Sequence, residues 1–275
     1  MILQTTFVTA TGRARLTDWI SVGSEHPLVL RMIEGLEGEV ELRMEYVVRF
    51  DYGSTIPWVS RTENSFLRAI AGPDALEFQS TFPVCGEKLK TVSNFNIAKG
   101  EVHECSIVWR ESSSKPFEQR IDCRSNLEST HKFWSEWVAK STYQGPYKNQ
   151  VDRSLLTLKA LIYEPTGGIV AAPTTSLPEV IGGTRNWDYR FSWVRDSTFT
   201  LYALLSTGFI EEAKAWRKWL VRALAGTPSQ VSSMYGIRGE RRLSESILDW
   251  LPGYENSRPV RVGNAAYKQR QLDIF

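Results

Sequence analysis

The chain has 275 residues, which allows one large domain or two of ordinary size. Hydrophobic residues make up 42% and charged residues 23%, so the sequence can bury a core and is neither disordered nor membrane-embedded in composition. The formal net charge of +2 gives no electrostatic case for a nucleic-acid or membrane-surface partner.

Residues 1–125 have the pattern of β structure. Between residues 39 and 50, apolar side chains alternate with mostly charged ones, which is typical of a strand with one buried and one solvated face. Gly35 and Gly38 lie between two apolar stretches, so we expect a hairpin there. Further turns are expected at residues 10–12, 50–53 and 98–100. Several short strands separated by turns predict a β-sandwich over residues 1–125.

The apolar period changes to that of helices after residue 125. We expect a linker helix within residues 126–147, where Phe133, Trp134 and Trp137 fall on one side. A second helix is predicted near residues 148–163, because one stripe carries Val151, Leu155, Leu158 and Ile162.

Two more helices are predicted after a long segment rich in Gly and Pro. The first begins near Arg195 and ends at Gly208, a natural C′ residue. The second spans residues 210–224, with acids in its first turn and bases later. Residues 264–275 have helical composition but end on apolar, uncapped residues. We interpret this ending as a truncated chain, with a short frayed helix as the alternative.

The sequence predicts no metal, no cofactor and no disulfide framework. The three cysteines form no CxxC pair and are odd in number, and the three histidines are isolated. The N-terminal residues lack the charged and apolar regions of a signal peptide, and no apolar run approaches ~18 residues. We therefore expect a cytoplasmic chain with no membrane partner. The oligomeric state is not indicated.

Residues 182–204 are the richest in chemistry. Two aromatic and charged clusters, at 187–190 and 193–196, stand where a loop enters a predicted helix, which Asp196 is placed to cap. Aromatic rings stack on the apolar face of a sugar ring, and an Arg–Asp pair offers charge-assisted hydrogen bonds to hydroxyls. From the residues alone, a buried structural Arg–Asp pair with core tryptophans is the stronger alternative to a sugar site.

Two long motifs resemble glycoside hydrolase family 15, which includes glucoamylases and some bacterial trehalases. Residues 186–196, NWDYRFSWVRD, follow the family pattern N-W-D-Y-R-[YF]-x-W-x-R-D throughout. Residues 245–273 resemble a second pattern, G-Y-x-x-S-x-P-V-R-x-G-N-x-A-x-x-Q-x-Q-L-D. The segments RMIEGLEGEVEL and RFDYG resemble the trehalase-like β-sandwich that precedes the barrel in bacterial members. The resemblance covers essentially the whole chain.

This resemblance implies that residues 148–275 are the N-terminal part of an (α/α)₆ barrel that holds a sugar in its mouth. Arg195 and Asp196 would then hydrogen-bond the outer hydroxyls of a non-reducing terminal glucose. The other implied substrate-binding residues are Tyr189, Trp193, Trp187, Asp188, Arg261 and Asn264. For Asn264, an ordinary turn into a helix is the alternative.

No catalytic residue is expected in this chain. The family hydrolyses with inversion, which needs two carboxyl groups roughly 6.5–9.5 Å apart with a water between one of them and the sugar. Its general acid lies in a G-I-W-E-like stretch, which is absent here, and its base lies later still, so both are expected beyond Phe275. We interpret Asp188, Glu245 and Asp273 as structural or substrate-positioning.

The predicted function is that of an inverting α-glucosidase of glucoamylase or trehalase type, acting on an α-glucoside or trehalose-like sugar, with this chain alone inactive. The alternative is a non-catalytic fragment or degenerate homologue with at most weak carbohydrate binding. A free-standing β-sandwich binding module with a helical tail is a third hypothesis.

Overall fold

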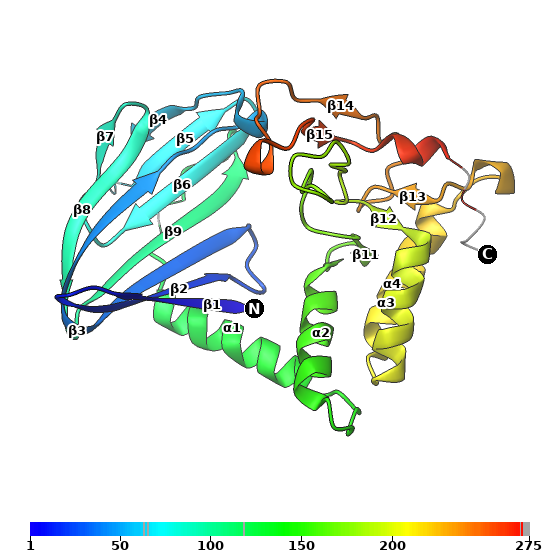
Figure 1. The fold of residues 1–275 in the computed structure, drawn as a ribbon, viewed down its shortest axis with the longest axis horizontal. Helices are drawn as coiled ribbons and strands as arrows, with labels where there is room; N and C mark the ends of the chain where they lie inside the picture. The colour runs from blue at the N-terminus through cyan, green and yellow to red at the C-terminus, as the bar shows by residue number, and fades with distance from the viewer. Residues whose placement is uncertain (63, 65, 118, 270, 272–275) are drawn as a thin grey trace. The chain divides into compact units, whose positions relative to one another are not determined.

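The computed structural model describes residues 1–62, 64, 66–117, 119–269 and 271. An antiparallel β region is followed by the helices α1–α4, so the predicted order of β then α structure is confirmed (Figure 1). The chain divides into two compact units, Met1–Ser135 and Glu136–Phe275, called the β unit and the helical unit below. No helix among the described residues is long and apolar enough to cross a membrane.

The β unit is built on one antiparallel sheet with the order β1-β2-β3-β9-β6-β5-β4, to which β8 and β7 are added through β3. Its strands are β1 (Ile2–Val8), β2 (Gly12–Ile20), β3 (Leu28–Tyr46), β4 (Trp58–Arg61), β5 (Leu67–Ala71), β6 (Asp74–Ser80), β7 (Cys85–Glu87), β8 (Lys90–Ala98) and β9 (Val102–Glu111). The turns expected at 10–12, 50–53 and 98–100 are all present.

Strand β3 is shared between two arms of the sheet. Residues 28–34 pair with β9, whereas residues 39–46 pair with β8. The main core cluster draws side chains from both arms, including Ile33 and Val40 of β3, Phe78 of β6 and Ile97 of β8. The alternation read in residues 39–50 is therefore that of a half-buried strand, although the strand ends at Tyr46.

The hairpin expected at Gly35 and Gly38 is wrong, because β3 runs through both residues. A Cβ on Gly35 would lie 1.9 Å from the carbonyl oxygen of Ala98, and Gly38 has a φ of +59° beside the carbonyl oxygen of Thr11. The glycines thus permit close backbone contact and an irregular register with β2, not a chain reversal.

The helical unit contains the helices α2 (Lys148–Ala160), α3 (Val194–Ser206) and α4 (Ile210–Ala223), while α1 (Cys123–Val138) spans the boundary between the units. Its short paired strands are β10 (Ile162–Tyr163) with β11 (Gly168–Ile169), β12 (Ser192–Trp193) with β13 (Met234–Tyr235), and β14 (Ser246–Ile247) with β15 (Arg261–Val262). Gly208 follows α3 with a φ of +95°, as a C′ glycine does.

The helices bury only part of their apolar surface within this unit. In α3, Leu201 and Leu204 are buried, but Phe199 and Tyr202 are 70% and 75% exposed. In α1, Trp137 is buried while Phe133 is exposed, so the expected common aromatic side is not buried as a whole.

The chain after Asn264 is less helical than its composition suggests. Ala265–Lys268 form a single 3₁₀ turn, and Gln269 has an extended backbone. The remainder of the expected helix, including Asp273, lies outside the described residues, apart from Gln271.

Candidate sugar-binding site

A cavity of about 610 Å³ lies in the helical unit, within the size range of small-molecule sites. It is lined by Ala171, Arg185, Trp187, Tyr189, Trp193, Arg195, Asp196, Glu245, Arg261, Asn264, Ala265, Ala266, Gln269 and Gln271. Seven of the eight residues that the sequence proposed for substrate binding are among them. The exception is Asp188.

The start of α3 carries the charged pair of the cavity wall. The helix begins at Val194, with Trp193 as its N-cap residue. The sequence predicted that Asp196 caps this helix, but Asp196 lies in the first turn instead. A carboxylate in the first turn is stabilised by the positive end of the helix dipole. Arg195 Nη2 lies 3.3 Å from Asp196 Oδ2, and the two side chains are 35% and 43% exposed. The pair is therefore not a core ion pair.

Asp196 Oδ2, the oxygen that is ion-paired with Arg195, can still accept a hydrogen bond. Asp196 Oδ2 is itself buried, yet it accepts no hydrogen bond from the described residues. Since buried acceptors are nearly always satisfied, an oxygen of this kind at a cavity wall is suited to a ligand hydroxyl.

Two aromatic rings lie beside the pair. The ring centroids of Tyr189 and Trp193 are 5.9 Å apart, with Tyr189 37% exposed and Trp193 buried. Burial and the negative charges of Glu179 and Asp196 raise the pKa of Tyr189, and they outweigh the positive charge of Arg185, which lowers it. The phenol therefore remains protonated at neutral pH and offers both an apolar face and a hydroxyl.

Asp188 does not line the cavity and has no exposed surface. Its Oδ1 accepts hydrogen bonds from the backbone N–H (3.1 Å) and Nε (2.9 Å) of Arg190. Its Oδ2 accepts from Arg190 Nη2 at 2.8 Å and from the backbone N–H of Gly263 at 3.0 Å. The four hydrogen bonds use up both oxygens, so in this arrangement the carboxylate joins the two sequence motifs and has no free position for a ligand.

The second motif is fixed by similar contacts. The amide of Asn264 donates to the backbone oxygen of Asp188 at 3.0 Å and accepts from the backbone N–H of Ala266 at 3.0 Å. Asn264 is thus the N-cap of the 3₁₀ turn, which is the alternative that the sequence left open, and it also lines the cavity.

Arg261 connects the second motif to the loop before α3. Its guanidinium lies 4.5 Å above the ring of Trp187, and its Nη1 donates to the backbone oxygens of Thr184 and Asn186. Glu245 accepts from the backbone N–H of Ala265, and its Oε1 lies 3.3 Å from Arg261 Nε. These contacts hold Trp187 and Arg261 rigidly in the wall.

Four polar residues of the lining were not proposed as binding residues: Arg185, Glu245, Gln269 and Gln271. The two glutamines stand in the Q-x-Q stretch of the second motif, which is the signal that pointed to them. Gln271 Oε1 is buried without a hydrogen-bond partner among the described residues. No three His, Cys, Asp or Glu side chains in the described part of the chain are grouped as metal ligands.

Comparisons with known proteins agree with the two motifs. A "Trehalase" of Mycolicibacterium smegmatis is 34% identical over 306 residues, which cover 100% of this chain and 45% of that protein. A "Trehalase 2" of Sulfolobus acidocaldarius is 47% identical over 131 residues, which cover 46% of this chain and 22% of the relative. The chain therefore spans less than half the length of these relatives.

A solved structure described as "Putative kojibiose phosphorylase from human microbiome" shares the fold. It covers 87% of this chain and 37% of its own, with a TM-score of 0.51 and 10% sequence identity. The profile of the family described as glycosyl hydrolases family 15 matches residues 145–275, the segment that contains the whole cavity. Residues 145–275 therefore match glycosyl hydrolases family 15, and trehalases align with the chain over its whole length.

Proposed function

We propose that the chain is part of a trehalase-type glycoside hydrolase and that the 610 Å³ cavity binds the terminal glucose of trehalose or a related α-glucoside. The observation that carries this proposal is the convergence of the two motifs on one cavity, with Arg195 and Asp196 in its wall. Trehalase relatives that align with the whole chain or with nearly half of it support the substrate class.

In this proposal the residues have distinct roles. Tyr189 stacks on the sugar, with Trp193 packed beside it, while Arg195 and Asp196 hydrogen-bond the outer hydroxyls. Asp196 Oδ2 supports this assignment, because it is ion-paired with Arg195 but accepts no hydrogen bond from the described residues, and a sugar hydroxyl would supply that donor. Trp187, Arg261 and Asn264 hold the wall in shape, and Asp188 is a positioning residue that keeps the two motifs together.

We infer that the helical unit is part of an (α/α)₆ barrel and that hydrolysis proceeds with inversion. The exposed faces of Phe199 and Tyr202 support further helices packing on α3. Of the lining carboxylates, Glu245 is held by Arg261 and Ala265, and Asp196 is assigned to hydroxyl binding. We therefore assign the general acid and base to the part of the family that this chain does not span.

The remaining architecture and the compartment are proposals of the same kind. We propose a β-sandwich over residues 1–125, a linker over 126–147 and barrel helices over 148–275. Shared use of β3 by two arms around one core supports the sandwich. The three free cysteines support a reducing, cytoplasmic location.

The test is sugar binding to this chain, measured by calorimetry and by saturation-transfer NMR with trehalose, maltose and isomaltose. We expect trehalose binding that Arg195→Ala weakens about 10- to 150-fold, as the loss of a charged hydrogen-bond partner does. Arg217→Ala, an exposed change in α4 outside the cavity, is the control. Equal trehalose binding by both variants would refute the site assignment.

A glucose-release assay tests the placement of the catalytic groups. This chain alone should release no glucose from trehalose above a protein-free blank. Joined to the remaining half of the Mycolicibacterium smegmatis relative, it should release glucose, and Arg195→Ala should lower kcat/KM of this chimaera about 30- to 1000-fold. An inactive chimaera with a normal melting curve would favour the non-catalytic alternative.

A further inference from the structure

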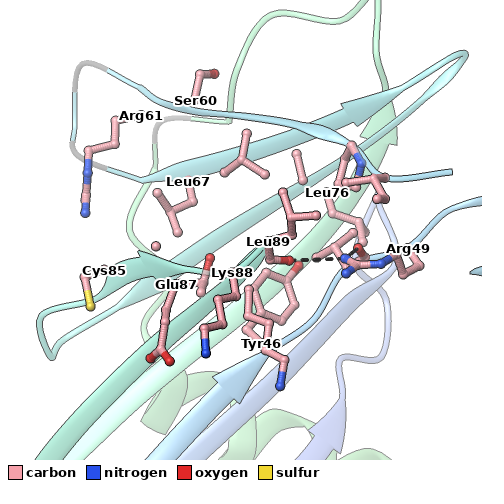
Figure 2. A pocket seen from close by; sticks show the side chains of 18 residues that line it. Tyr46, Arg49, Ser60, Arg61, Leu67, Leu76, Cys85, Glu87, Lys88 and Leu89 are labelled. Carbon is pink, nitrogen blue, oxygen red and sulfur yellow. Dashed lines mark hydrogen bonds between the residues drawn. The ribbon is translucent and has the colours of Figure 1, made fainter.

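A second cavity, of about 430 Å³, lies in the β unit and is independent of the proposed sugar site. It is lined by two edge strands of the sheet, β4 and β7, each of which pairs on one side only within the described residues. Figure 2 shows Ser60 and Arg61 of β4 on one side and Cys85 and Glu87 of β7 on the other, with Leu67, Leu76 and Leu89 between them.

The wall between the edge strands is apolar. Leu67 and Ala69 of β5 are buried, and Leu67 belongs to the main core cluster, so the cavity opens onto the core of the β unit. Val48, Leu76 and Leu89 complete this surface. An apolar wall of this kind favours a ligand with a hydrocarbon body.

The cavity also contains an unused hydrogen-bond donor. Tyr46 is held by its ring, which stacks on Phe78 at 4.8 Å. Its hydroxyl oxygen is buried and has no hydrogen-bond partner among the described residues. Burial, with a smaller contribution from Cys105, raises the pKa of Tyr46, so the phenol stays protonated. A buried donor without an acceptor is costly, and a ligand oxygen would remove that cost.

Two cations of the lining, Arg49 and Lys88, have no counter-ion among the described residues. Arg49 Nη1 donates only to the backbone oxygens of Val48 (2.6 Å) and Leu89 (3.2 Å), and Lys88 makes no hydrogen bond or ion pair with the described residues. Among the described lining residues, Glu87 is the one acidic side chain, and it is paired with Arg43 at 3.3 Å. The cavity therefore favours an anion.

We propose that this cavity binds a small amphipathic carboxylate, whose hydrocarbon body lies on Leu67, Ala69 and Leu76. The carboxylate accepts a hydrogen bond from the Tyr46 hydroxyl and neutralises Arg49 and Lys88. A free sugar fits the surface less well, because most of its hydroxyls would face apolar side chains. A peptide strand fits less well too, since β4 and β7 offer edges of only four and three residues.

The chain carries its own reporter for this site, Cys85, which is exposed and lines the cavity. The other two thiols are buried, and burial raises the pKa of Cys105 to about 11 and that of Cys123 to about 12. At neutral pH, N-ethylmaleimide should therefore react mainly at Cys85. Octanoate is the probe, with 1-octanol as its uncharged counterpart.

We expect octanoate to bind with a Kd of roughly 0.2–5 mM, as its size allows. At ten times the Kd, labelling of Cys85 should slow about tenfold, because only the empty fraction reacts. Octanol at its solubility limit should protect less than octanoate at the same concentration. Unchanged labelling in octanoate at about 20 mM, roughly four times the weakest Kd expected, would overturn the proposal, as would equal protection by octanol.

Two variants test the polar contacts separately. Tyr46→Phe keeps the ring and removes the hydroxyl, so the Kd should rise about tenfold. Lys88→Asn suits the φ of +48° at this exposed position and should raise the Kd about threefold. Lys99→Asn, in the exposed β8–β9 turn, is the control and should change nothing. An unchanged Kd for octanoate in Tyr46→Phe contradicts the proposal. If Tyr46→Phe has a lowered melting temperature, an unchanged Kd in Lys88→Asn contradicts the proposal instead.

Discussion

Replacing Asp188 with Asn tests whether this carboxylate joins the two motifs of the proposed sugar site. Each of its oxygens accepts two hydrogen bonds, Oδ1 from Arg190 and Oδ2 from Arg190 and Gly263. In asparagine an NH₂ group replaces one of these oxygens. Whichever way the amide is turned, the two N–H donors that contacted that oxygen then face the NH₂ group, which cannot accept from them. Since Asp188 is fully buried, the free energy of unfolding should fall by about 3–5 kcal/mol, as when a buried ion pair is broken.

This loss is measurable as a shift of the helical unit's melting transition. For a unit of this size, 1 kcal/mol corresponds to roughly 3 °C, so we expect a decrease of about 9–15 °C. Circular dichroism follows the helices, and the change in urea midpoint at constant m-value gives the free energy. Arg190→Gln and the double variant complete a cycle, in which the two losses should overlap strongly. A decrease below about 1 kcal/mol for Asp188→Asn would refute the structural role assigned to the carboxylate.

The remaining predictions concern the cavity wall, Gly263 and the half-buried Glu212. Arg195→Ala and Asp196→Ala should each lower kcat/KM of the chimaeric trehalase about 30- to 1000-fold in a glucose-release assay. Their melting temperatures should change little, because the pair is more than a third exposed and worth at most about 1 kcal/mol. Gly263→Ala should destabilise the helical unit in urea unfolding by about 1–3 kcal/mol, since the new Cβ would lie 2.0 Å from the carbonyl oxygen of Ser244 at a φ of +78°. Burial alone would raise the pKa of Glu212, but hydrogen bonds from Trp137 and Lys159 outweigh it and lower the pKa below the ordinary 4.5. The stability that ionised Glu212 contributes is present above pH 4.5 and is lost as the pH falls through its folded-state pKa. The free energy of unfolding of Glu212→Gln, measured against pH, should lack this decrease.

Elements with a clean apolar period were predictable from the sequence. The alternation of residues 39–46 and the acidic start and basic end of residues 210–223 each reflect a local physical requirement, burial of one face or compensation of the helix dipole. Gly35 and Gly38 were misread because glycine serves two purposes, chain reversal and close backbone approach. Only the distant partners decide between them, and here these are Ala98 and Thr11.

The site shows the same division between local and distant causes. The motif itself indicated that aromatic rings and the Arg195–Asp196 pair would stand together, because all of them lie within a few residues of one helix start. It did not separate Asp188 from Asp196, since each aspartate lies in a short cluster of tryptophan, arginine and acid.

What distinguishes the two aspartates is a backbone N–H group 75 residues away. Gly263 donates to Asp188 and completes its four hydrogen bonds, which leaves that carboxylate buried and saturated. Asp196 Oδ2 has only the ion pair with Arg195 and accepts no hydrogen bond from the described residues at the cavity wall. Aspartate therefore has a structural role at position 188 and a proposed ligand-binding role at position 196. If this reasoning holds, trehalose should protect the stability of the chain in wild type and in Asp188→Asn, but not in Asp196→Asn, where the acceptor is weakened. Thermal melts with and without trehalose compare these three proteins directly, and equal protection of Asp196→Asn and wild type would contradict the division of roles.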